Sequence, residues 1–231
     1  MKLLKLSKDF SVEILFEDEN LIAVSKPEGL ASIAENDSTI DSLHTLLEKK
    51  LSQKLFIVHR LDKEVSGVIL FAKNTQTHKL LNRQFNNRTI SKYYLALVHG
   101  NVEDDNGKIN KPIREFGSGR MGVDEPKGKP SETKYHVVKR YGEYTLLELN
   151  PSTGRRHQLR VHLYHLGHPV VGDLRYGNKN SQIKFPRLML HAKSLEFIIP
   201  NGKQIIVEAE IPDSFKDILN NLKSEIVLQK S

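Results

Sequence analysis

Alternation of apolar and polar residues predicts that strands make up much of this chain. A period of two is typical of a half-buried strand, and short apolar runs rich in β-branched residues are typical of buried strands. The strands expected from these patterns are residues 12–16, 21–26, 55–58, 68–72, 92–100, 131–140 and 144–150. Near the C-terminus, two more apolar runs flank Asn201-Gly202. An Asn-Gly pair between such runs predicts a hairpin.

Apolar residues spaced three and four apart predict helices, which are fewer than the predicted strands. The expected helices run from about Ser38 to Leu51, with Ile40, Leu43, Leu47 and Leu51 on one face, from Asn74 to Phe85, from Arg155 to Leu166, and through residues 211–222. Ser38 and Asp213 are the expected N-caps. Gly167 and Pro169 are placed to end the third helix.

Strands outnumber the predicted helices, and short turns join many neighbouring strands. This pattern favours an α+β fold, a single domain built on a mixed, largely antiparallel β-sheet with flanking helices. Residues 101–130 are rich in Gly, Pro and charge, and we expect them to form a long excursion that holds at most a hairpin. We find no internal repeat and no low-complexity segment.

Composition excludes several classes of protein. The 231 residues are 38% hydrophobic, enough for a substantial core. The absence of cysteine excludes disulfides, thiolate metal sites and cysteine nucleophiles. The N-terminal apolar stretch is broken at Lys5, Lys8 and Asp9, and no run approaches the length of a membrane span. We therefore expect a cytoplasmic protein with no membrane partner.

The charge of the chain favours a polyanionic partner. The formal net charge is +7, and residues 108–140 hold nine Lys and Arg against four Asp and Glu. Residues 151–175 add four Arg and four His against one Asp. Clustered basic residues are typical of nucleic-acid binding, although a mildly basic protein without such a partner is an equally open interpretation of net charge alone.

Asp62 stands between two runs that are expected to be buried strands, in the segment HRLDKEVSG. One interpretation is a loop carboxylate that caps a turn or pairs with Arg60 or Lys63. The other is a carboxylate held ionised by a nearby arginine, able to act as a nucleophile or a base. On this second interpretation, we expect the charge partner of Asp62 to come from another segment of the chain.

The third predicted helix offers such a partner. Its predicted buried stripe consists of Leu159, Leu163 and Leu166, with His162 beside it. His157, Arg160 and Tyr164 share a different face. Arg155 at the helix start is poorly placed for the helix dipole, which indicates a role outside the helix such as contact with an anion.

The histidines of this segment raise a metal hypothesis. His162, His165 and His168 are three residues apart, and His157 precedes them. Metal-binding histidine pairs on helices usually lie four apart with an acid between them, and no acid is present here. We therefore expect no metal, and the missing acids also count against a metal-dependent nuclease. Core or RNA-facing histidines are the favoured interpretation.

Five segments together resemble the RluA-type pseudouridine synthases, in the order of that family's motifs. These are ILFEDENLIAVSKPEGL, HRLDKEVSGVILFAK, SKYYLALVHG, GRRHQLRVHLYHLGHPVVGDLRYG and RLMLHAKSLEF. The resemblance implies the fold of that family with a central active-site cleft. It also implies isomerisation of uridine to pseudouridine in structured RNA, a stem-loop of ribosomal or transfer RNA, without a metal or an organic cofactor.

Each site residue follows from its place in these motifs. The resemblance implies that Asp62 is the catalytic aspartate and that Tyr94 stacks on the uracil and takes part in proton removal. It implies that Arg160 pairs with the catalytic carboxylate and that Arg60 fills the gap left by the flipped nucleotide. Arg155 and His157 are the other expected RNA-binding residues, together with Arg156 and the 108–140 segment.

Some features depart from the family pattern. Val65 stands where Thr is usual, and Arg156 stands where a small hydroxyl residue is common. The first motif begins near residue 14, so we expect residues 1–231 to be one catalytic domain without an N-terminal RNA-binding domain. We also expect a monomer. The alternative hypothesis is an RNA-binding or RNA-folding protein whose catalytic site is vestigial, and the intact Asp62, Tyr94 and Arg160 argue against it.

Overall fold

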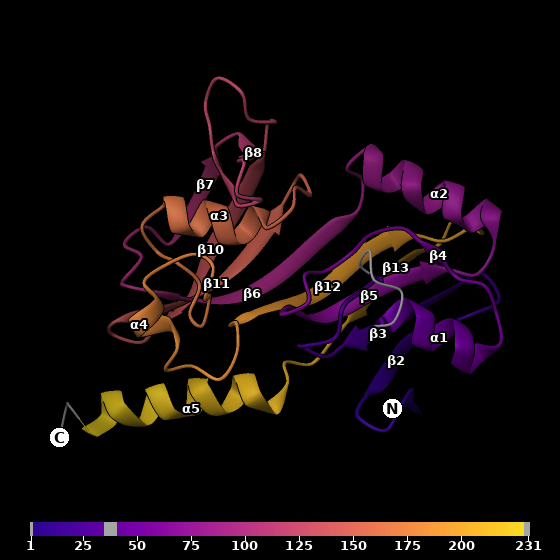
Figure 1. Cartoon of the computed structure of the whole chain (residues 1–231), viewed down its shortest axis with the longest axis horizontal. Coiled ribbons are helices and arrows are strands. Elements are labelled where there is room, and N and C mark those ends of the chain that lie inside the picture. The colour runs from indigo at the N-terminus through magenta and orange to yellow at the C-terminus, as the bar shows by residue number, and fades with distance from the viewer. Residues whose placement is uncertain (1, 35–40, 229–231) are drawn as a thin grey trace. The chain divides into compact units, whose positions relative to one another are not determined.

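The chain folds into two compact units. The computed structural model describes residues 2–34 and 41–228, with residues 225–228 as backbone only. Unit 1 consists of Met1–Lys92 and Ala192–Glu210, and unit 2 of Tyr93–His191 and Ile211–Ser231. Each unit has its own strands and helices (Figure 1).

Unit 1 is a sheet with a helix on each face. Its elements are β1 (Lys2–Lys5), β2 (Ser11–Glu17), β3 (Leu21–Lys26), α1 (Leu43–Leu51), β4 (Phe56–Ile57), β5 (Ser66–Ala72), α2 (Thr75–Asn86), most of β12 (Leu190–Ile198) and β13 (Gln204–Glu208). The strand order is β1-β2-β3-β5-β12, with β4 paired to β5 and β13 to β12. The registered pairs in this unit run antiparallel. Gly202, at φ +83°, lies in the turn between β12 and β13 and confirms the Asn-Gly hairpin.

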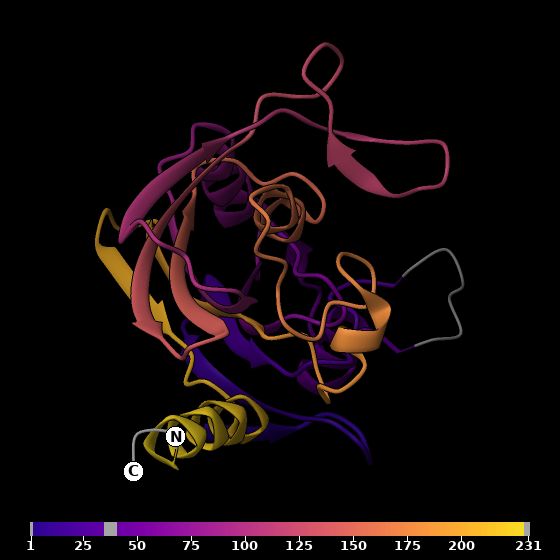
Figure 2. The same ribbon diagram turned by 90° about the vertical axis from the view of Figure 1, so that its left-hand side faces the viewer.

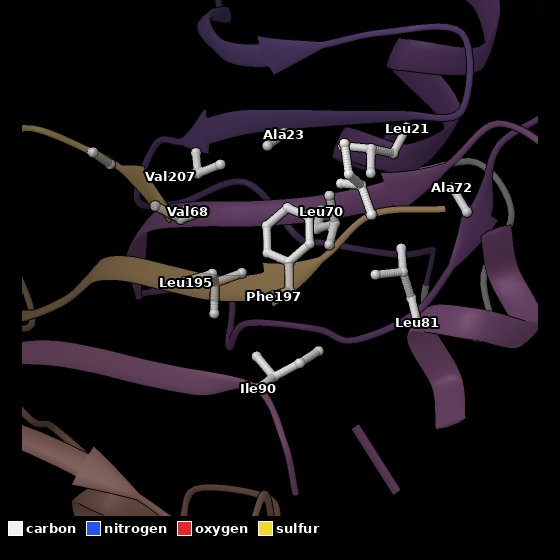
Figure 3. Close-up of a cluster of buried hydrophobic side chains, with 12 residues drawn as sticks. Leu21, Ala23, Val68, Leu70, Ala72, Leu81, Ile90, Leu195, Phe197 and Val207 are labelled. Atoms are coloured by element: carbon white, nitrogen blue, oxygen red, sulfur yellow. The ribbon is translucent and has the colours of Figure 1, made fainter. Parts of the chain in front are cut away.

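Strand β5 is buried along its whole length because helices cover both of its faces. Val68 and Leu70 face a cluster that includes Leu81 of α2 and Phe197 of β12. Figure 3 shows these side chains converging from several strands and one helix. On the opposite face the ring of Phe71 lies 5.7 Å from that of His44 in α1. Burial on both faces explains why β5 is a continuous apolar run instead of an alternating one.

Two polar side chains cap the helices of unit 1. Asn74 caps α2, and its Oδ1 accepts from the Thr77 N–H at 2.9 Å. Helix α1 is capped by Ser42 in a capping box with Thr45. The predicted cap Ser38 and the predicted apolar position Ile40 lie outside the described residues.

Unit 2 is a curved antiparallel sheet that carries helix α3 on one face (Figure 2). Its elements are most of β6 (Ser91–His99), β7 (Asn106–Asn110), β8 (Ile113–Glu115), β9 (Met121–Val123), β10 (Glu132–Arg140), β11 (Tyr144–Pro151), α3 (Gln158–His165), α4 (Lys179–Gln182) and α5 (Asp213–Leu228). The strand order is β6-β11-β10-β7. Gln158 and His162 attach α3 to β10 through the Thr133 hydroxyl, at 3.1 and 2.9 Å.

The excursion at residues 101–130 is more ordered than the sequence indicated. Strand β7 pairs with β10 from Asn106 to Asn110 and extends the sheet, and β8 and β9 form a separate hairpin. The prediction of at most one hairpin is therefore wrong. Ile109 is buried in this pairing, a long-range contact that the Gly-rich local composition did not reveal.

Helix α3 begins later than predicted. Arg155 and Arg156 precede it, and His157 is its N-cap in the left-handed region at φ +54°. Because Arg155 is not in the helix, the argument from the helix dipole does not hold. Leu166 is also exposed and not part of a buried stripe, whereas every residue from Gln158 to Leu163 is buried.

The fold class is confirmed: an α+β protein whose strands pair largely antiparallel with a few helices beside them. The prediction of one domain over residues 1–231 with a central cleft stays a prediction. Within the part of the chain that the structure describes, no helix is long and apolar enough to cross a membrane.

Candidate active site

The loop that carries Asp62 is fixed on both sides of the aspartate. The Leu61 N–H donates to the Ser32 hydroxyl at 3.1 Å, and that hydroxyl donates to the Leu61 carbonyl at 2.7 Å. On the other side the Lys63 carbonyl accepts from the Gly29 N–H at 2.9 Å. Leu61 is buried while Asp62 is partly exposed. The backbone is thus held in place around a residue that is itself partly exposed.

Lys26 ties this loop to the preceding one. Its side chain is fully buried, and its Nζ donates to the carbonyls of Pro27 and Leu30 at 2.8 Å and of Lys63 at 3.1 Å. Three carbonyl dipoles around an ammonium offset much of the cost of burying its charge. The lysine therefore joins the end of β3 to the Asp62 loop.

His59 attaches the start of the same loop to the core. Its Nε2 accepts from the Leu70 N–H at 3.0 Å, so Nδ1 carries the proton of the neutral ring. The ring stacks on Phe85 with centroids 5.0 Å apart. Burial, and secondarily the charge of Lys92, lowers the pKa of His59 to about 3. His59 is therefore a neutral structural group at neutral pH.

This pKa predicts a specific sensitivity to acid. A histidine that titrates near 6.5 when unfolded and near 3 when folded gives stability that is present above pH 6.5 and is lost as the pH falls below it. Between pH 7 and 4.5 we expect the free energy of unfolding to fall by about 2–3 kcal/mol more in the wild type than in His59→Gln. Urea titrations at both pH values measure this difference.

The control for this experiment is His136→Gln, on an exposed position of β10. Its loss of stability between the two pH values should equal that of the wild type. Equal acid sensitivity of the wild type and His59→Gln would contradict the assignment of His59 as a neutral ring in the folded protein.

The other predicted residue on this loop is Arg60, whose side chain is exposed. Val65, at the usual position of a threonine, is buried. Its side chain thus supports the loop by packing rather than by a hydroxyl contact.

Unit 2 holds the remaining predicted catalytic residues. Tyr94 lies on β6 opposite Leu149 of β11 and is partly buried. Arg160 lies in the first half of α3 and is almost fully buried. Because Asp62 belongs to unit 1, the prediction that the three side chains meet around one cleft stays a prediction.

Arg160 is held by a carboxylate that the sequence did not single out. Its Nε donates to Asp173 Oδ2 at 2.7 Å and its Nη2 to Asp173 Oδ1 at 2.8 Å. The pair is bidentate and buried at both ends. Arg160 therefore does not lie on an exposed face of α3, and its expected pairing with the catalytic carboxylate stays a prediction.

The basic residues before α3 contact the β8–β9 hairpin and its flanks. Arg156 Nη1 lies 2.9 Å from Glu115 Oε1 at the end of β8. Arg155 Nη2 lies at the limit of hydrogen bonding, 3.5 Å, from the Pro130 carbonyl. His157 Nδ1 lies 2.9 Å from the Tyr176 hydroxyl. These residues therefore lie together at one end of α3, beside the basic hairpin.

The comparisons with known proteins decide the family. Residues 20–165 match the family model described as RNA pseudouridylate synthase. This chain belongs to the RluA-type RNA pseudouridine synthases. The synthase is accordingly an isomerase.

Relatives of the synthase agree with this family. It is 37% identical over 223 residues to a ribosomal large subunit pseudouridine synthase C of Buchnera aphidicola, covering 90% of this chain and 70% of the relative. It is 36% identical to a ribosomal large subunit pseudouridine synthase D of Borreliella burgdorferi, covering 91% and 68%. Its fold matches a human protein, RNA Pseudouridylate Synthase Domain Containing 1, with a TM-score of 0.76 and 27% identity over 96% of this chain and 98% of that one.

The histidines around α3 of the synthase have structural partners. His162 bonds the Thr133 hydroxyl and the Lys111 carbonyl, both at 2.9 Å. His168 Nδ1 lies 2.9 Å from the His99 carbonyl. Among the described residues we find no group of three or more side chains that could hold a metal ion.

Sequence reasoning missed the supporting residues Lys26, Ser32, His59 and Asp173. Three of them, all but Ser32, fall inside the quoted family motifs. Their position in those motifs was the available signal, but residue type alone indicated surface residues, because lysine and aspartate are rarely buried without a partner.

Proposed function

We propose that this synthase converts uridine to pseudouridine in the large-subunit ribosomal RNA, with Asp62 as its catalytic carboxylate. The observation that carries this proposal is the Asp62 loop, in which the backbone on both sides of the aspartate is fixed and the residue itself is partly exposed. The ribosomal substrate is supported by the names of the relatives from Buchnera and Borreliella.

The chemistry assigns a part to each side chain. The bond from N1 of uracil to C1′ of ribose breaks, the base turns, and C5 bonds to the same C1′. The hydrogen on C5 leaves as a proton and N1 takes up a proton, so the product is an isomer of the substrate. Asp62 serves this sequence as nucleophile or base. Tyr94 stacks on the uracil, which recovers about 1–3 kcal/mol of the unstacking energy. Arg160 pairs with the carboxylate, and Arg60 occupies the gap in the RNA.

In this proposal the basic part of unit 2 binds the RNA. Arg155, Arg156 and His157 lie beside the β8–β9 hairpin, in a segment with excess positive charge. Contacts of these side chains with phosphates position the RNA without reading its sequence. RNA affinity should therefore fall as salt rises.

Release of tritium tests the activity, because uracil loses its C5 hydrogen in this reaction. Purified protein is incubated with transcripts of ribosomal and transfer RNA that carry 5-tritiated uridine, and pseudouridines are mapped in cells with and without the gene. We expect release from the large ribosomal RNA and loss of at least one pseudouridine there. Release from transfer RNA alone would contradict the ribosomal substrate. Salt-sensitive binding without release from any RNA would instead favour the vestigial RNA-binding protein.

We also infer that the synthase works in the cytoplasm as a monomer. Its proposed substrate is made and assembled in that compartment in bacteria, the source of the relatives named above. Size-exclusion chromatography with light scattering should give the mass of one chain, 26.4 kDa.

A further inference from the structure

Asp173 is buried and its carboxylate accepts four hydrogen bonds. Its Oδ1 accepts from the N–H groups of Arg175 and Tyr176, at 2.9 and 3.0 Å, in addition to Nη2 of Arg160. Its Oδ2 accepts from Nε of Arg160. Its exposed fraction is 1% and that of Arg160 is 4%. The two backbone bonds fix the carboxylate, and the carboxylate in turn fixes the arginine.

The loop that carries Asp173 is itself rigid. The side-chain oxygen of Gln182 accepts from the Gly172 N–H at 2.6 Å, and its nitrogen donates to the Val170 carbonyl at 3.0 Å. A Cβ on Gly172 would lie 1.8 Å from the Arg187 carbonyl oxygen, so two stretches of backbone are in close contact there. The guanidinium of Arg160 thus rests on a support with little freedom to move.

This support sets the direction of the guanidinium. A bidentate pair through Nε and Nη2 defines the plane of the group and uses two of its five N–H donors. The donors on the far side, including both of Nη1, then point in one fixed direction. Tyr176 adds to this restraint, because its ring lies 5.3 Å from the Arg160 Cζ atom.

We propose that Asp173 is a positioning residue, which orients the Arg160 guanidinium toward the catalytic carboxylate of the synthase. This inference rests on the proposed function, in which Arg160 pairs with Asp62. Asp173 does not touch the RNA in this scheme. It acts through Arg160 alone, so its loss should slow the reaction without weakening RNA binding.

The same loop also holds the β8–β9 hairpin, so the test must separate rate from binding. The Tyr176 hydroxyl accepts from the Met121 N–H at 3.3 Å, and Arg175 Nη2 donates to the Gly119 carbonyl at 2.7 Å. A merely structural loss at Asp173 would loosen this hairpin and lower RNA affinity. A positioning role would leave the affinity unchanged.

The test measures single-turnover tritium release and filter binding with the large-subunit ribosomal RNA transcript. We expect Asp173→Asn to lower the rate about 100-fold, the scale of the loss when a catalytic group is misplaced by about 1 Å, with the Kd within about threefold of wild type. On the Arg160→Ala background the same change should lower the rate less than about threefold more, since residues that act as a unit are not additive. Asp105→Asn, which removes the exposed partner of Arg140, is the control and should keep the wild-type rate.

A second variant keeps the proposal testable if Asp173→Asn does not fold. Asp173→Glu retains the buried charge but displaces the guanidinium by the length of one methylene, and we expect about a tenfold slower rate at unchanged Kd. A wild-type rate in Asp173→Asn or Asp173→Glu would overturn this inference and leave the proposed function standing. The same holds if the two changes in the double variant lower the rate independently of each other. Absence of release by the wild-type protein on every RNA would overturn the proposed function and the inference with it.

Discussion

Asp62→Asn is expected to lower the single-turnover rate of pseudouridine formation by at least about 10³-fold. The amide has nearly the shape of the carboxylate, and the contacts that fix the loop belong to the backbone of Leu61 and Lys63, so the loop should keep its conformation. What is lost is the negative oxygen that serves as nucleophile or base. Tritium release from labelled ribosomal RNA gives the rate.

RNA binding separates this effect from misfolding. Filter binding should give the same Kd for Asp62→Asn as for the wild type, because the proposed phosphate contacts lie in unit 2. Glu64→Gln removes an exposed carboxylate of the same loop and is the matched control, with a rate near that of wild type. Turnover by Asp62→Asn at more than a tenth of the wild-type rate would end the assignment of Asp62.

Gly67→Ala is expected to lower the free energy of unfolding by about 3–5 kcal/mol. Gly67 has φ +114°, a region that side chains rarely adopt, and a Cβ there would lie 2.1 Å from the Ala192 carbonyl oxygen. The backbones of β5 and β12 therefore approach too closely for any side chain at this position. Urea titration followed by circular dichroism measures the change.

Gly142→Ala separates strain from crowding. Gly142 has φ +65°, also in the left-handed region, but no atom lies within 4 Å of the position of its Cβ. This control should lose only about 1–2 kcal/mol, the cost of the backbone conformation. Equal losses in the two variants would contradict close contact between β5 and β12 as the reason for glycine at position 67.

Much of the fold could be predicted from local patterns because those patterns record burial on one face. The strands at β2, β6 and β11 follow the alternation of apolar residues, and the hairpin at Gly202 follows from the geometry of a tight turn. The expected start of a helix at Asn74 was also a local feature, because an N-cap and its partner N–H lie within one turn. The family was also predicted from the sequence, because five segments resemble its motifs and occur in the same order as in the family.

The rest depends on contacts between distant residues, which periodicity does not record. Strand β7 was missed because it pairs with β10, and the paired residues of the two strands are more than twenty positions apart in the sequence. The amphipathic interpretation of α3 failed because a loop covers the side that carries Arg160, whose partner Asp173 follows thirteen residues later. Lys26 would be assigned to the surface by residue type, yet carbonyls from two separate loops surround its ammonium.

The lysine has a consequence for protein engineering. Its ammonium links Leu30 to Lys63, residues that belong to two different motifs. Exchanging the aspartate loop between related enzymes would therefore transplant only half of an interlocked structure. A functional chimera has to carry both loops and the lysine as one module, so substitutions that retune this region should be selected jointly rather than one at a time.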